Sequence, residues 1–119
     1  MSKLRSIFSA SLALVAASRA GDAPDAAQIA FFEKSIRPVL AEKCYKCHSA
    51  DSEKVKGGLL LDTRDGIRAG GDSGHAVVPG NVGESLLIKA LRHTDKDMAM
   101  PPEKSGGKLS DSVIADFEK

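Results

Sequence analysis

Two cysteines and a histidine in the first half of the chain carry the clearest chemical signal. Cys44, Cys47 and His48 form the pattern C-x-x-C-H, which is typical of covalent haem attachment. Two thiols on one helical turn can each add to a vinyl group of the same porphyrin, and the adjacent imidazole can then bind the iron. Because the chain has only these 2 cysteines, the pattern predicts one haem c, attached through Cys44 and Cys47, with His48 as an axial ligand.

Other functions of the cysteine pair fit the surrounding sequence less well. A structural zinc site needs four ligands, usually in two spaced pairs. Here the cysteines and His48 are bunched, and only His75 or His93 could complete the set. A thioredoxin-like redox pair requires a strand–helix–strand pattern, which the flanking sequence lacks. A zinc-stabilised interaction domain therefore stays as the weakest alternative.

The iron face opposite His48 has four candidate ligands, which are Met98, Met100, His75 and His93. A thioether sulfur is soft and raises the reduction potential of the iron. Two prolines follow Met100 and stiffen its segment, while Met98 would point to the same side of an extended chain. Spacing alone does not choose between the methionines, but the prolines favour Met100, with Met98 as the alternative. We interpret His93 as a helix cap and His75 as a loop residue.

The first 20 residues have the character of a secretory signal peptide. Lys3 and Arg5 precede an apolar stretch at 7–17, which is too short to span a bilayer, and 18–20 form a small-x-small cleavage site. We expect an exported protein, periplasmic or otherwise extracytoplasmic, with no transmembrane segment after cleavage. Cleavage removes three positive charges and no negative charge, so the formal net charge changes from +1 to −2. That balance argues against binding to nucleic acid.

The remaining residues predict a small all-α domain at 29–119, after a flexible lead-in at 21–28. A first helix, interrupted at Pro38, is indicated by apolar residues at helical spacing: Ile29, Phe32, Ile36, Val39, Leu40 and Cys47. Further helical segments are predicted at 62–68, at 84–91 and after Ser110. We interpret 49–58 as a surface loop and 59–61 as core wall. So short a chain, with few aromatic residues, gains from a buried porphyrin.

The order of these motifs resembles the planctomycete-type cytochrome c domain, a single-haem family of the class I-like group. The resemblance runs from about Phe31 to the last residue and covers these segments: 32–40, 44–48, 56–62, the glycines of 70–74, 79–80, 85–87, 100–102 and 109–110. It implies a helical domain wrapped around one haem c, thioether bonds to Cys44 and Cys47, and iron ligation by His48 and Met100. Family members continue further, so we interpret this domain as truncated in its last helix, and as a candidate part of a larger multidomain protein.

The function implied is electron transfer, with no substrate turned over and no catalytic residue. The sequence names no redox partner. The alternative is a haem-based peroxidase or sensor module, which needs a sixth ligand that can be displaced.

Covalent haem attachment is directly testable. When the protein is made with a c-type maturation system, a denaturing gel should stain for haem, and the mass should increase by one haem. Alanine at both Cys44 and Cys47 should abolish the increment because no thioether can form, whereas a change at His75 should leave it intact. A mass without the increment would contradict the prediction.

Overall fold

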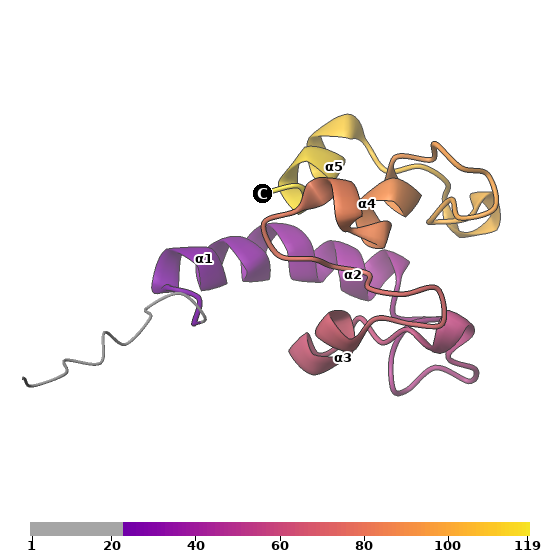
Figure 1. Cartoon of the computed structure of the whole chain (residues 1–119), viewed down its shortest axis with the longest axis horizontal. Helices are drawn as coiled ribbons and strands as arrows, with labels where there is room; N and C mark the ends of the chain where they lie inside the picture. The colour runs from indigo at the N-terminus through magenta and orange to yellow at the C-terminus, as the bar shows by residue number, and fades with distance from the viewer. Residues whose placement is uncertain (1–22) are drawn as a thin grey trace, which may run out of the picture.

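The computed structural model describes residues 23–119, so the expected signal peptide at 1–20 lies outside the described residues. Every regular element within 23–119 is a helix, which confirms the all-α prediction (Figure 1). The α-helices are α1 (Ala26–Phe31), α2 (Arg37–Lys43), α3 (Arg64–Ala69), α4 (Leu86–Leu91) and α5 (Asp111–Phe117). The shorter elements are the π-helix η1 (Phe32–Ile36) and the 3-10 turns η2 (Lys56–Gly58), η3 (Val82–Glu84) and η4 (Glu103–Ser105).

The elements α1, η1 and α2 follow one another without a loop and form a single rod. The rod begins at Ala26, inside the segment expected as a lead-in, because Asp25 and Gln28 form a capping box. Pro38 lies in the first turn of α2, where its missing N–H is least costly. The interruption predicted there takes the form of a π turn, closed by a hydrogen bond from Arg37 N–H to Phe32 O.

The π turn decides which side chains of the rod face the core. Ile36 and Leu40 are buried, and both Phe31 and Phe32 pack against them. In a regular α-helix, the residues three and four positions before Ile36 would lie on its face. Because the π turn adds one residue, Phe32 and Phe31 take those two places. The prediction that Ile29 shares this face was wrong, because the added residue rotates it away and leaves it 49 % exposed.

Two apolar clusters hold the helices together. The first, here the rod cluster, contains buried Ile36, Leu40 and Leu61. The second, here the α4–α5 cluster, contains Ile88, Leu91 and Ile114. Phe117 packs against both clusters, so α5 contacts both η1 and α4. The helix that follows Ser110 therefore joins the rod to α4.

Side-chain caps fix the starts of α3 and α5. The hydroxyl of Thr63 accepts a hydrogen bond from Gly66 N–H at the start of α3, and Ser110 does the same for Val113 at the start of α5. Between them, Gly70 has a φ of 75° and approaches Gly74 so closely that a Cβ would lie 2.3 Å from the Gly74 carbonyl oxygen. The glycine-rich segment is therefore a tight turn.

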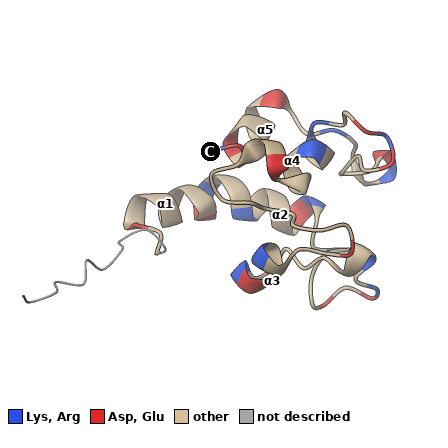
Figure 2. Ribbon diagram, viewed as in Figure 1, with Lys and Arg blue, Asp and Glu red and all other residues tan. Residues whose placement is uncertain are grey.

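Charged side chains are distributed over the helices and loops, with both signs interspersed (Figure 2). In this view no helix gathers Lys and Arg alone, and nucleic-acid binding is not indicated. Among residues 23–119, none of the helices has the length and apolar character needed to cross a bilayer.

The rod offers a matched pair of substitutions for testing the core. Leu40→Ala removes a side chain that is 2 % exposed, and should lower the free energy of unfolding by about 2–5 kcal/mol. Ile29→Ala removes a half-exposed side chain from the same rod, and should change it by about 0.5 kcal/mol or less. Denaturant titration of both variants measures the difference. Equal losses would mean that the π turn does not set the buried face.

Candidate functional site

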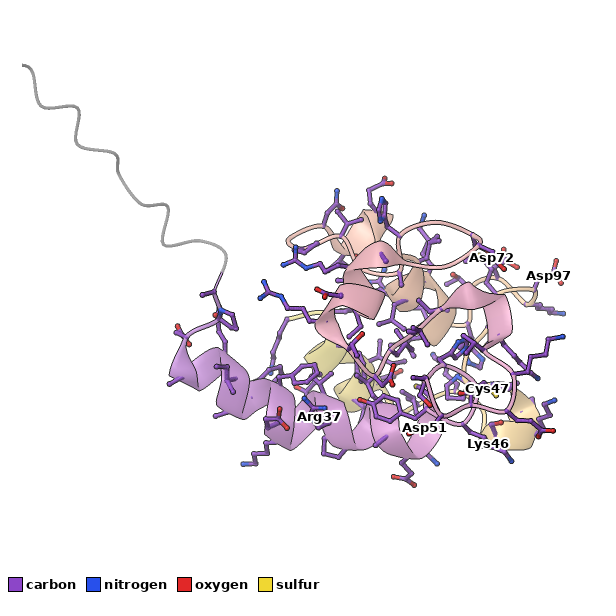
Figure 3. The ribbon with its side chains drawn as sticks, turned by 90° about the horizontal axis from the view of Figure 1, so that it is seen from below. Arg37, Lys46, Cys47, Asp51, Asp72 and Asp97 are labelled. Carbon is purple, nitrogen blue, oxygen red and sulfur yellow. The ribbon has the colours of Figure 1, made fainter. Side chains whose placement is uncertain are left out.

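A single turn after α2 carries both cysteines and the histidine. The N–H groups of Cys44 and Tyr45 donate to Leu40 O, and those of Cys47 and His48 donate to Cys44 O at 3.1 and 3.0 Å. These bonds continue the helical winding past Lys43 and bring the two thiols and the imidazole together. Both cysteines are free thiols and partly buried. Lys46 and Cys47 lie at the end of the molecule away from α1 (Figure 3).

The His48 ring is held in one tautomer by the main chain. Its Nδ1 lies 3.2 Å from Leu59 O. A carbonyl oxygen can only accept, so Nδ1 carries the proton and the neutral ring keeps the Nε2 lone pair free. The backbone is held as well, because Leu61 N–H donates to His48 O at 2.7 Å. This is the arrangement by which an imidazole metal ligand is normally oriented.

Two serines that the sequence analysis placed in a plain surface loop secure the cysteine turn. Ser49 is buried, and its hydroxyl donates to Tyr45 O at 2.7 Å. The Ser52 hydroxyl donates to the same carbonyl at 2.9 Å and accepts from Ser49 N–H at 3.0 Å. The spacing Ser-x-x-Ser directly after the histidine was the signal that could have revealed them.

Burial raises the pKa of the Cys44 thiol from 9.0 to about 11, and the neighbouring Cys47 adds a smaller Coulombic contribution in the same direction. The thiol packs against the rod cluster and has little contact with water. Cys44 therefore stays protonated at neutral pH and behaves as a small apolar side chain.

Met100 is fixed through both of its main-chain polar groups. Its N–H donates to Ala90 O at 3.1 Å, and its carbonyl oxygen lies 3.0 Å from His93 Nε2. The peptide bond between Met100 and Pro101 is cis. The prediction that His93 caps α4 with its ring was wrong: Arg92 is the C-cap, and the His93 ring binds the Met100 segment instead.

The Met100 segment lies at the same end of the molecule as the cysteine turn (Figure 1). A Cβ at Gly106 would lie 3.4 Å from Lys43 Nζ, so the chain after the two prolines reaches the end of α2. Met100 is 39 % exposed, which leaves its sulfur uncommitted to the core, whereas Met98 is partly buried. His75 is exposed in a separate turn.

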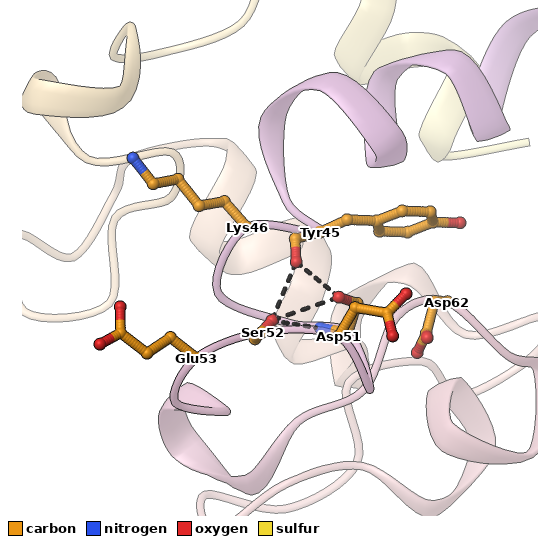
Figure 4. A pocket seen from close by; sticks show the side chains of 7 residues that line it. Tyr45, Lys46, Asp51, Ser52, Glu53 and Asp62 are labelled. Carbon is orange, nitrogen blue, oxygen red and sulfur yellow. Dashed lines mark hydrogen bonds between the residues drawn. The ribbon is translucent and has the colours of Figure 1, made fainter.

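A pocket of about 510 Å³ lies beside the cysteine turn (Figure 4). Its lining consists of Tyr45, Lys46, Ser49, Asp51, Ser52, Glu53 and Asp62. None of the four residues predicted to hold haem lines it. The Asp62 carboxylate closes the turn from this side, because its Oδ2 accepts from Ala50 N–H at 3.0 Å.

The donor set at the cysteine turn fits a c-type haem. Two thiols, an imidazole with its Nε2 uncommitted and an accessible thioether sulfur are the groups that such a haem uses. Within residues 23–119, no three Cys, His, Asp or Glu side chains gather in a way that could hold a metal ion.

Fold and site together define the class: a small helical domain with a C-x-x-C-H turn, which is the class of c-type cytochromes. The sequence model of the family described as Planctomycete cytochrome C matches residues 44–104, more than half of the chain. The chain therefore belongs to that family, and is a haem c domain. The comparisons with curated proteins and with solved structures give no significant match.

The raised pKa of Cys44 predicts a pH dependence of the haem-free protein. Alkylation of Cys44, followed by peptide mass measurement, should reach half its maximal rate near pH 11 in the folded chain and near pH 9 in urea. The unfolded chain loses this proton first, so the free energy of unfolding should fall as pH rises from 9 through about 11. The Cys44→Ser variant should lack this fall. Alkylation of the folded chain with a midpoint near 9 would contradict the burial argument.

Proposed function

We propose that this protein transfers electrons through one haem c, bound covalently by Cys44 and Cys47 and ligated by His48 and Met100. The observation that carries the proposal is the His48 ring. Its Nδ1 proton is committed to Leu59 O at 3.2 Å, so Nε2 is free to bind iron. The family assignment supports the cofactor, and suggests a carrier of electrons rather than an enzyme.

Each residue of the site has a distinct task in this proposal. The thiols of Cys44 and Cys47 would anchor the porphyrin through thioether bonds, and their turn carries His48 beside them as the iron ligand. The rod cluster behind Cys44 keeps water from that side. The haem, when bound, supplies an iron that cycles between two oxidation states.

Met100 is preferred to Met98 because of how the main chain is held. Met100 has hydrogen bonds at both its N–H and its carbonyl oxygen, and both partners lie at the end of α4. The N–H of Met98 donates to Asp95 O at 3.2 Å, within its own loop. A side chain on a fixed backbone loses less freedom when its sulfur binds iron.

We further propose that the protein works outside the cytoplasm. Family membership supports this location, since covalent attachment of haem c belongs with export, and the sequence of residues 1–20 has the character of a signal peptide.

Substitution of each methionine separates the two candidate ligands. In the haem-loaded, oxidised protein, Met100→Ala should remove the weak sulfur-to-iron absorption band, while Met98→Ala should keep it. Loss of the thioether should also lower the reduction potential, because axial ligands help to set it over a range of about 0.8 V. Absorption spectra and a redox titration measure both effects.

The same variants test the alternatives. If Met98→Ala loses the band and Met100→Ala keeps it, the ligand assignment is wrong. A wild-type protein with a five-coordinate iron would instead favour a peroxidase or sensor module, since both need an open sixth position.

A further inference from the structure

His93 occupies a backbone conformation that is unfavourable for it. Its φ is 55°, and within residues 23–119 it is the only residue other than glycine with a positive φ. Seven glycines take up positive φ elsewhere in the described chain. The position directly after a helix C-cap commonly requires this conformation, and glycine is preferred there because it has no Cβ. A histidine at this position therefore indicates that its side chain makes an interaction that glycine could not make.

The ring makes this interaction with Met100. His93 Nε2 donates to Met100 O across 3.0 Å, as it must, because a carbonyl oxygen only accepts. One turn earlier, Ala90 O accepts from Met100 N–H at 3.1 Å, and Ala90 O also accepts from His93 N–H at 3.2 Å. The end of α4 is thus hydrogen-bonded to the Met100 main chain on both sides of its Cα. A glycine at position 93 would keep the end of α4, but the Met100 carbonyl oxygen would lose its hydrogen bond.

We propose that His93 is a positioning residue for the axial ligand: its ring holds the Met100 main chain so that the sulfur stays on the iron. This inference rests on the proposed function, in which Met100 binds iron. His93 itself touches neither the iron nor the porphyrin in this role, and acts through the backbone of Met100.

Added imidazole is the probe that measures the effect, because it competes with the methionine sulfur for the ferric iron. Its apparent affinity rises with the fraction of molecules in which the sulfur is off the iron. Loss of one ordinary hydrogen bond corresponds to about a fivefold change in the ratio of molecules with the sulfur off the iron to molecules with the sulfur on it. In the haem-loaded protein, His93→Gly should therefore bind imidazole about fivefold more tightly than the wild type.

Three further variants make the test specific. His93→Asn tolerates positive φ, but its amide is too short to reach Met100 O, so it should behave like His93→Gly. His93→Gln places an amide nitrogen near the position of Nε2, and should restore the wild-type affinity. His75→Gly is the matched control at an exposed histidine, and should leave the affinity unchanged.

The outcomes separate this inference from the function on which it rests. If the wild type lacks the sulfur-to-iron band, the ligation by Met100 is wrong and the role of His93 falls with it. If the wild type has the band and Met100→Ala loses it, ligation stands. In that case, wild-type imidazole affinity in His93→Gly and His93→Asn would overturn the positioning role. Equal affinity in the Gln and Gly variants would overturn it too, whatever their melting temperatures.

Discussion

The packing of Phe117 against both apolar clusters is the contact on which the geometry of the site depends. The His48 side is tied to the rod cluster, since Leu61 is buried there and its N–H holds His48 O. The Met100 side is tied to α4, whose Leu91 belongs to the other cluster. The two proposed ligands thus rest on separate parts of the core. Their relative position is set by α5, which follows both of them in the sequence.

In this protein, buried hydroxyl groups fix turns that a larger apolar core would hold in other proteins. Ser49 ties down the cysteine turn through Tyr45 O, and Ser85 ties down the turn before α4 through Asn81 O at 2.8 Å and Val78 N–H at 2.9 Å. Each serine is buried with its hydrogen bonds satisfied, so burial carries little penalty. The cysteine turn and the turn before α4 are therefore fixed by short polar side chains rather than by bulk.

Local chemistry explains which features the sequence could predict. The caps at Thr63 and Ser110 depend on residues within one turn, and the helices that they start were predicted at 62–68 and after Ser110. The exposure of Ile29 was not predicted, because it follows from the π turn of η1, which the regular helical spacing of apolar residues does not reveal. The contact of His93 with Met100 was missed for a similar reason. It closes a loop of seven positions beyond the end of α4, where the spacing of residues along a helix does not apply. Assignment of Cys44, Cys47, His48 and Met100 to haem stays a prediction.

The π-helix also bears on how the length of this chain can vary. It inserts one residue between Phe32 and Ile36 without adding a full turn. A chain with one residue fewer there would form an unbroken α-helix that presents the same two phenylalanines to the rod cluster. Homologous chains can therefore differ by a single-residue insertion or deletion at this point, with the cysteine turn delivered to the same place. An alignment gap within 33–35 would then record a change in local winding rather than a change in fold.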